Sequence, residues 1–232
     1  MLRLITDFDG PIMDVSERYY QVYKFCLEQT RHANQPVRQL SKPEFWHRKR
    51  ARIPEQQIGR DSGLEPLQAE KFAQLRRQTV HTHPYLAYDQ PVPGAVEALS
   101  KLQGAGFDLV VMTMRRVREL NEALIRCDLG QFFDPERRYC LSNDYIKTGD
   151  TKDKPLLMAR ALVELPPASE VWMVGDTEAD MIAAQTHGIK TMGVLSGIRD
   201  RTQLNLYKPD AIFHNLSEVV DSVIHQTLLA IR

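Results

Sequence analysis

Near its start the chain reads Leu2-Arg3-Leu4-Ile5-Thr6-Asp7-Phe8-Asp9-Gly10-Pro11. The apolar run over residues 2–6 has the length of a buried β-strand, and the carboxylates and the Gly-Pro pair that follow would end it. We therefore predict a strand over residues 2–6 with two acidic side chains at its carboxyl end.

From residue 89 onward, short β-rich runs alternate with amphipathic helical patterns. The predicted strands cover residues 107–112, 138–141, 171–174, 191–194 and 211–213. The predicted helices follow Pro93-Gly94 and lie near residues 117–127, 155–163, 179–187 and 216–229. Such alternation is typical of a parallel sheet with helices on both faces. The sequence thus predicts an α/β fold with a doubly wound, Rossmann-like parallel sheet.

The segment between these two parts has a different character, with no pattern typical of a buried strand. Amphipathic stretches cover residues 17–30 and 66–80, and a further one opens at Ser41, three residues before Glu44. That spacing is typical of a capping box, in which each side chain binds an otherwise unpaired backbone N–H. The predicted domains are an α/β core formed by residues 1–15 and 89–232 and an all-helical cap formed by residues 16–88.

Composition argues against several classes of protein. The 232 residues include 30 basic and 30 acidic side chains, so the formal net charge is zero. A neutral chain lacks the strong field of a general nucleic-acid or membrane-surface binder. The three cysteines form no CxxC pair, which argues against a zinc site or a disulfide framework. With no signal peptide or membrane-spanning run, we expect a cytoplasmic protein without nucleic-acid or membrane partners. The sequence predicts no oligomeric state.

Polar side chains follow the predicted strands at the edge where their carboxyl ends meet, and one precedes a predicted helix. Ligands of open parallel sheets bind beyond this edge. The candidate site residues are Asp7, Asp9, Thr113, Lys154, Asp176 and Asp180. Four separate segments thus deliver two pairs of carboxylates, a hydroxyl and an ammonium group to one place.

This set of groups suits phosphoryl transfer. A carboxylate can attack the phosphorus and form an aspartyl-phosphate, which we assign to Asp7. Neighbouring carboxylates repel one another unless a divalent cation lies between them, and Mg²⁺ prefers oxygen ligands. We predict Asp176 as the best metal ligand, with Asp180 in or just outside the first coordination shell.

The remaining candidates have roles in charge compensation and proton transfer. Lys154 would neutralise the phosphate and the nucleophile, and Thr113 would donate a hydrogen bond to phosphate. Asp9 would give a proton to the leaving oxygen and later take one from water. Lys152 competes with Lys154, which we favour because Pro155 fits a helix start.

The four segments resemble the motifs of the haloacid dehalogenase (HAD) superfamily and occur in that family's order. They are Asp7-Phe8-Asp9-Gly10, Met112-Thr113, Lys154-Pro155 and Gly175-Asp176-Thr177-Glu178-Ala179-Asp180. The resemblance covers residues 1–15 and 89–220 and implies that the backbone carbonyl of Asp9 joins Asp7 and Asp176 around Mg²⁺. Pro11 departs from the Thr or Val usual in the family, which affects the loop's phosphate contacts.

The inserted segment is similar to the helical cap of the subgroup that contains phosphoglycolate phosphatases and β-phosphoglucomutases. In that subgroup the cap closes over the site and selects the substrate. The resemblance therefore implies that substrate choice depends on residues 16–88, where the match to the family is weakest.

We predict a Mg²⁺-dependent phosphatase that hydrolyses a small phosphate monoester of a phosphorylated metabolite through an aspartyl-phosphate. A phosphomutase acting on a sugar phosphate would use the same core residues. A dehalogenase would not need Asp9 or the metal carboxylates. A non-catalytic module that binds a phosphate ligand or a partner protein is disfavoured by the intact set of polar residues. The sequence does not identify the ester.

Residues outside the motifs are expected to be structural. The basic cluster over residues 47–52 is predicted to be a solvated helix face, and His81 and His83 are predicted to be surface residues. Trp172 is expected to serve packing. For Arg115 and Arg116, contact with substrate and a structural role are equally supported.

Overall fold

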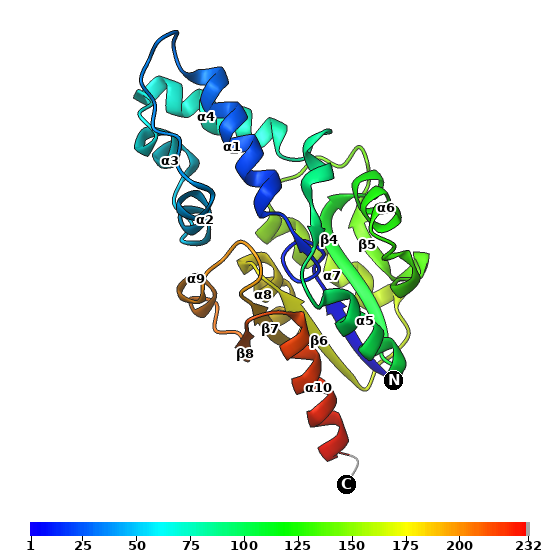
Figure 1. The fold of residues 1–232 in the computed structure, drawn as a ribbon. Helices are drawn as coiled ribbons and strands as arrows, with labels where there is room; N and C mark the ends of the chain where they lie inside the picture. Colours follow the sequence, from blue (N-terminus) through cyan, green and yellow to red (C-terminus); the bar gives the residue numbers. More distant parts are fainter. Residues whose placement is uncertain (231–232) are drawn as a thin grey trace.

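The computed structural model describes residues 1–230 and contains a six-stranded parallel sheet with helices on both faces (Figure 1). The strand order is β5-β4-β1-β6-β7-β8. The bounds are β1 Leu2–Thr6, β4 Asp108–Arg116, β5 Arg138–Leu141, β6 Glu170–Gly175, β7 Lys190–Val194 and β8 Ala211–Phe213. The predicted fold class is confirmed, and β1, β5 and β8 have the predicted bounds.

Alternating side chains of the strands form two separate cores. Leu4 of β1 packs in one cluster, and the adjacent Ile5 packs in the other. The first cluster is covered by α5 (Ala95–Gly104), α6 (Val117–Arg126) and α10 (Leu216–Ala230), and the second by α7 (Asp150–Glu164) and α8 (Glu178–Gln185). Trp172 lies fully buried in the first cluster, as predicted. Ligands of such doubly covered parallel sheets bind beyond the carboxyl ends of the strands, so this edge is the place to look for a site.

Helix α7 begins at Asp150 rather than near residue 155, so the predicted start of this helix was wrong. The carboxylate of Asp153 accepts hydrogen bonds from the backbone N–H groups of Thr148 and Gly149, at 2.9 and 3.1 Å. This side chain stabilises the start of the helix ahead of Pro155. The proline therefore lies inside the helix, where it removes one backbone hydrogen bond.

The residues between the first strand and the rest of the sheet form helices with a core of their own. They are α1 Ser16–Thr30, α2 Lys42–Arg50, α3 Glu55–Asp61 and α4 Pro66–Thr79. Tyr23, Phe45 and Phe72 pack in this separate core, and Figure 1 shows these helices as a group beyond the carboxyl edge of the sheet. The capping box of Ser41 and Glu44 is confirmed. We call this group the helical cap, as proposed from the sequence.

Two chain connections join the helical cap to the sheet, and they lie side by side. Strand β2 (Met13–Asp14) precedes α1, and β3 (Gln90–Pro91) follows the short 3₁₀ helix Tyr85–Tyr88. The two strands pair antiparallel, with Met13 opposite Pro91. The chain therefore leaves and re-enters the core at one point, next to the loop that follows β1. Within residues 1–230, no helix combines the length and apolar character that crossing a bilayer requires.

Three further short elements complete the structure: the 3₁₀ helices Gly130–Phe132 and Pro135–Arg137 and helix α9, Arg201–Asn205.

Candidate active site

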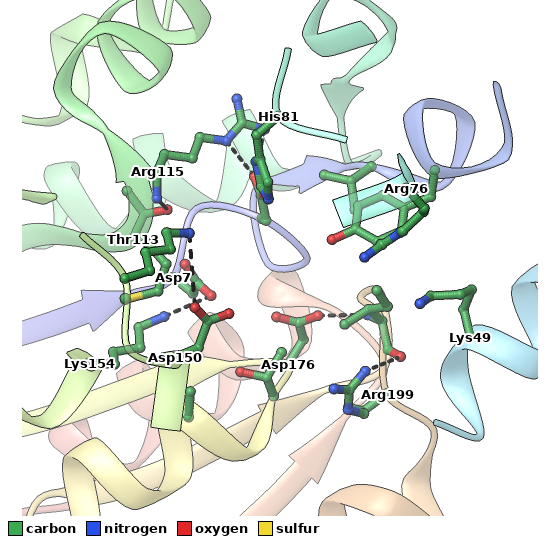
Figure 2. A pocket seen from close by; sticks show the side chains of 18 residues that line it. Asp7, Lys49, Arg76, His81, Thr113, Arg115, Asp150, Lys154, Asp176 and Arg199 are labelled. Atoms are coloured by element: carbon green, nitrogen blue, oxygen red, sulfur yellow. Dashed lines mark hydrogen bonds and ion pairs between the residues drawn. The ribbon is translucent and has the colours of Figure 1, made fainter. Parts of the chain in front are cut away.

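The predicted polar residues gather at the carboxyl edge of the sheet, beside a cavity of about 240 Å³ (Figure 2). Its lining includes Asp7, Asp9, Thr113, Lys154 and Asp176. The helical cap contributes lining residues from α1, α2 and α4, namely Tyr19, Lys49 and Arg76. The cavity thus lies between the sheet and the cap, and both parts of the chain can contact a small molecule inside it.

Asp7 is fixed at the end of β1 by contacts to both of its carboxylate oxygens. Its backbone N–H donates to the carbonyl of Val174 at 2.8 Å. Oδ1 accepts from the N–H of Phe8 at 2.7 Å, and Oδ2 lies 2.8 Å from Nζ of Lys154. Burial raises the pKa of the Asp7 carboxyl well above its usual value, and the nearby Lys154 ammonium opposes this shift. Lys154 therefore favours the ionised form that a nucleophile requires.

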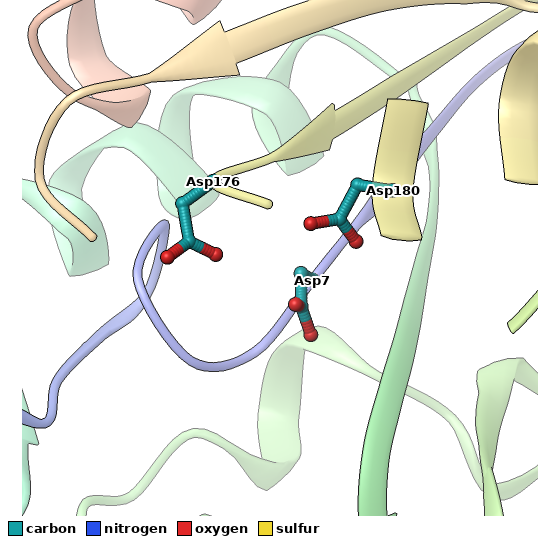
Figure 3. Close-up of side chains that lie close together, drawn as sticks. All are labelled: Asp7, Asp176 and Asp180. Atoms are coloured by element: carbon teal, nitrogen blue, oxygen red, sulfur yellow. The ribbon is translucent and has the colours of Figure 1, made fainter. Parts of the chain in front are cut away.

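Asp7, Asp176 and Asp180 form a buried cluster of carboxylates from three different elements (Figure 3). One oxygen of each lies within 4.8 Å of the others. Burial raises the pKa of Asp176 to about 7, and the negative charge of Asp180 adds to the effect. Within residues 1–230, Lys154 is the one cation whose charged group contacts two members of the cluster. The cluster thus carries an excess of negative charge that a divalent cation would offset.

Two glycines leave room for the Asp176 side chain. A Cβ atom added at Gly10 or at Gly197 would overlap the Asp176 carboxylate. Gly10 also has a φ of +93°, which disfavours other residues. The N–H of Ile198 donates to Oδ2 of Asp176 at 2.6 Å. This cradle fixes the buried Asp176 carboxylate close to Asp7, and we propose these two side chains as the ones that would hold Mg²⁺.

Asp180 is occupied by structural contacts as well as by the cluster. Its Oδ2 accepts from the N–H and the hydroxyl of Thr177, at 3.0 and 2.7 Å, and forms the capping box of α8. Its other oxygen pairs with Lys154. Asp180 thus both caps a helix and orients the lysine that contacts Asp7.

Lys154 is buried at the cavity beside Asp7, whereas Lys152 is exposed on the surface of α7. Although burial lowers the pKa of Lys154, the paired carboxylates Asp180 and Asp7 outweigh it, so its pKa is raised and it stays charged. Our choice between the two lysines agrees with this placement, but its stated reason, a helix start at Pro155, was wrong.

Asp9 is half-buried and is not part of the carboxylate cluster. Two arginines bind its side chain. Arg115 donates to Oδ1 from Nε at 2.8 Å, and Arg18 donates to Oδ2 from Nη2, also at 2.8 Å. Burial alone would raise the pKa of Asp9, but Arg115 and Arg18 outweigh it and hold the pKa well below its usual value. The ionised carboxylate can accept a proton. For Mg²⁺, the backbone carbonyl of Asp9 stays the proposed ligand atom.

Thr113 lies 2% exposed within the extended end of β4, and its Oγ1 accepts from the N–H of Arg115 at 3.2 Å. This contact leaves the hydroxyl hydrogen for another acceptor, consistent with the proposed bond to phosphate. Arg116 instead donates to backbone carbonyls of residues 142–145. Of the two arginines that the sequence left undecided, only Arg115 lines the cavity.

The prediction of a solvated basic face on α2 was wrong for Lys49. This side chain lines the cavity, 8% exposed, and its Nζ pairs with Glu55. It lies one helical turn after the buried Phe45, and that spacing was the signal for an inward position. His81 also lines the cavity, against its predicted surface position, because the cap's return segment passes beside Arg18.

Comparison with known proteins adds a family match. A family model described as haloacid dehalogenase-like hydrolase matches residues 3–188. The phosphorylated carbohydrates phosphatase of Thermotoga maritima is 26% identical over 232 residues, which cover 95% of this chain and 100% of that protein. The pyrophosphatase PpaX of Bacillus velezensis is 30% identical over 124 residues, or 53% of this chain and 55% of that protein. The match thus spans about half the length of this second relative.

A solved structure shows the same fold. The crystal structure of a predicted phosphoglycolate phosphatase from Haemophilus somnus aligns with a TM-score of 0.62 and 18% identity. The alignment covers 95% of this chain and 97% of that chain, so it includes the helical cap as well as the sheet.

Proposed function

The chain belongs to the haloacid dehalogenase-like hydrolases, which confirms the resemblance seen in the motifs, and we propose that it hydrolyses a small phosphate monoester with Mg²⁺ and a phosphorylated Asp7. The observation that carries this proposal is the convergence of Asp7, Asp176 and Lys154 at one side of the cavity. Its relatives are named as phosphatases, which favours an enzyme over the non-catalytic module considered above.

The proposed reaction has two halves. In the first, an oxygen of Asp7 attacks phosphorus, and the bond to the alcohol oxygen breaks. In the second, Asp9 takes a proton from a water that attacks the same phosphorus, and the electron pair of the breaking bond returns to the Asp7 carboxylate. Lys154 offsets the negative charge of the phosphoryl oxygens, and Thr113 donates a hydrogen bond to one of them. When bound, Mg²⁺ supplies positive charge to these oxygens and to the carboxylates.

Asp9 has different tasks with different leaving groups. An alkoxide needs a proton, and Asp9 must carry one to supply it, which Arg18 and Arg115 oppose. An aryl phosphate releases a stabilised phenolate that needs no proton, so only the second task of Asp9 is required. Aryl phosphates are therefore the simplest probe of this site.

Removal of the metal tests the proposal directly. Treatment with EDTA is expected to reduce hydrolysis of p-nitrophenyl phosphate by at least about 100-fold, because the buried carboxylates then repel the substrate phosphate. Added Mg²⁺ should restore the full rate. The measurement is release of nitrophenolate before and after metal addition. Undiminished activity in EDTA would reject the metal-dependent mechanism.

Cations on the cap side of the cavity favour a substrate with a second anionic group. Lys49 and Arg76 both pair with Glu55, which leaves one positive charge in excess. Arg199, which pairs with Glu178, lines the same region. In Figure 2, these three side chains lie on the side of the cavity away from Thr113 and Lys154. We propose that this region binds a carboxylate or second phosphate on the leaving group.

Substitution of Lys49 tests this substrate class. Lys49→Met is expected to raise KM for phosphoglycolate or a sugar bisphosphate by at least about 10-fold, and to change KM for p-nitrophenyl phosphate less than about threefold. Glu55 keeps Arg76 as its partner, so the fold should tolerate the change. The matched control is Arg48→Met, which removes a cation of the same helix that pairs with Asp61 and does not line the cavity. Equal effects on both types of substrate would contradict the proposal.

A further inference from the structure

Four charged side chains form a closed ring at the loop that follows β1. They are Asp9, Arg18, Asp89 and Arg115. Nη2 of Arg115 lies 2.6 Å from Oδ1 of Asp9 and also pairs with Asp89. Nη2 of Arg18 lies 2.8 Å from Oδ2 of Asp9, and its Nε lies 3.1 Å from Oδ1 of Asp89. Each carboxylate therefore contacts both arginines, and the charges of the ring cancel.

Asp9 is by far the most exposed of the four members of the ring. The side chains of Arg18 and Asp89 are 0% exposed and that of Arg115 is 1% exposed, whereas Asp9 is 24% exposed. Burying charged groups costs free energy even when they are paired, so such groups are weak contributors to stability. We therefore look for the role of the three buried members in their effect on Asp9.

The ring joins segments that are distant in the sequence. Arg18 lies in the first turn of α1, Asp89 lies just before β3, and Arg115 lies in the last part of β4. These are the two connections of the helical cap and the strand beside β1. The ring is thus complete only when both connections are seated against the core.

We propose that Arg18, Asp89 and Arg115 are positioning residues that fix both oxygens of Asp9 for its proton transfer from the attacking water. Arg115 holds Oδ1 with two nitrogens and Arg18 holds Oδ2, which leaves the carboxylate little freedom to rotate. Asp89 in turn holds both guanidinium groups. The inference rests on the proposed function, because it assigns Asp9 to the water step.

Burst kinetics with p-nitrophenyl phosphate test the proposal. Loss of Asp9 positioning should slow only the second half of the reaction, so phosphorylated Asp7 accumulates. We expect Asp9→Asn and Arg115→Lys to release about one equivalent of nitrophenolate in a burst, and then to turn over about 10- to 100-fold more slowly than the unmodified protein. Lysine keeps the charge but cannot hold Asp9 with two nitrogens. Stopped-flow absorbance measures both phases.

A second variant keeps the test valid if a single substitution in the ring unfolds the protein. Because removal of one charge from a buried ring is strongly destabilising, Arg18→Gln is combined with Asp89→Asn, which keeps the ring neutral. Thermal unfolding confirms that each variant folds. The double variant should show the same burst and slow turnover. Adding Arg115→Lys to Asp9→Asn should slow turnover by less than about threefold more, because the positioned group is already absent.

Arg126 provides the matched control. It donates to the backbone carbonyls of Asp89 and Leu86, at 2.7 and 3.2 Å, and so holds the same connection without contacting Asp9. Arg126→Lys should show no burst. Folded ring variants that turn over slowly without a burst would have a structural role only and would overturn the proposal, as would full additivity with Asp9→Asn. An unmodified protein without Mg²⁺-dependent phosphatase activity would instead reject the proposed function.

Discussion

Replacing Asp7 by asparagine is expected to reduce turnover of p-nitrophenyl phosphate by at least about 10³-fold in saturating Mg²⁺. An amide has the shape of the carboxylate but cannot form the acyl phosphate, because its nitrogen and oxygen are poor nucleophiles. Lys154 keeps Asp180 as its partner in this variant, so the buried ammonium is not left unpaired. The effect should therefore be chemical rather than structural.

Two measurements separate these possibilities. Acid quench followed by intact-protein mass spectrometry should detect phosphate on the unmodified protein, or on Asp9→Asn, and none on Asp7→Asn. Thermal unfolding should remain within a few degrees of the unmodified protein. The control is Asp221→Asn, the same chemical change on the exposed surface of α10. A phosphorylated or fully active Asp7→Asn protein would show that the nucleophile is another group.

The sheet was predictable because its strands are apolar on both faces. Leu4 and Ile5 enter different cores, and such a strand shows a continuous apolar run that ends at polar residues. Strand β4 extends to Arg116, beyond its predicted end at residue 112. Its polar end, Thr113 to Arg116, lies against the cavity and the loop of residues 142–145 and has no apolar pattern. The short helix α3 was missed for a similar reason, since seven residues give too little periodicity.

The candidate site was predictable where it depends on strand ends, and not where it depends on the cap connections. Asp7 and Asp176 follow strands whose neighbours are set by the parallel topology, and Thr113 lies near the end of another such strand. Arg18 and Asp89 meet because β2 and β3 pair. Each of these strands has only two residues, and no spacing in the sequence indicates that they pair. The contacts of Asp9 therefore required the structure, whereas its nearness to Asp7 did not.

The metal-free protein is expected to lose stability as the pH rises from about 4 to about 7. In the folded state burial and Asp180 raise the pKa of Asp176 to about 7, whereas an unfolded aspartate titrates near 4. The protonated carboxyl thus favours folding below about pH 4, and this contribution disappears as the folded group ionises. Asp89, whose pKa burial raises to about 6, acts in the same direction. The loss should be on the order of a few kcal/mol, measured by urea unfolding in EDTA across this range.

Substitution of Asp176 by asparagine should stabilise the metal-free protein and abolish its response to Mg²⁺. In EDTA at pH 8, Asp176→Asn is expected to unfold at a higher temperature than the unmodified protein, because one of the buried, mutually repelling carboxylates is gone. Asp89 and Asp7 keep their contributions, so part of the pH dependence remains. The same variant should lose phosphatase activity by at least about 100-fold.

Added Mg²⁺ should separate the two proteins most clearly. At about 100 times its dissociation constant, a ligand that binds only the folded state contributes about 2.7 kcal/mol, which corresponds to about 5–10 °C in Tm for a chain of this size. We expect this rise for the unmodified protein and for Asp221→Asn, and almost none for Asp176→Asn. Buried carboxylates that repel one another with no ion between them would only destabilise the fold. An equal Mg²⁺-induced rise in Asp176→Asn would therefore place the cation elsewhere and remove the reason for the cluster of Asp7, Asp176 and Asp180.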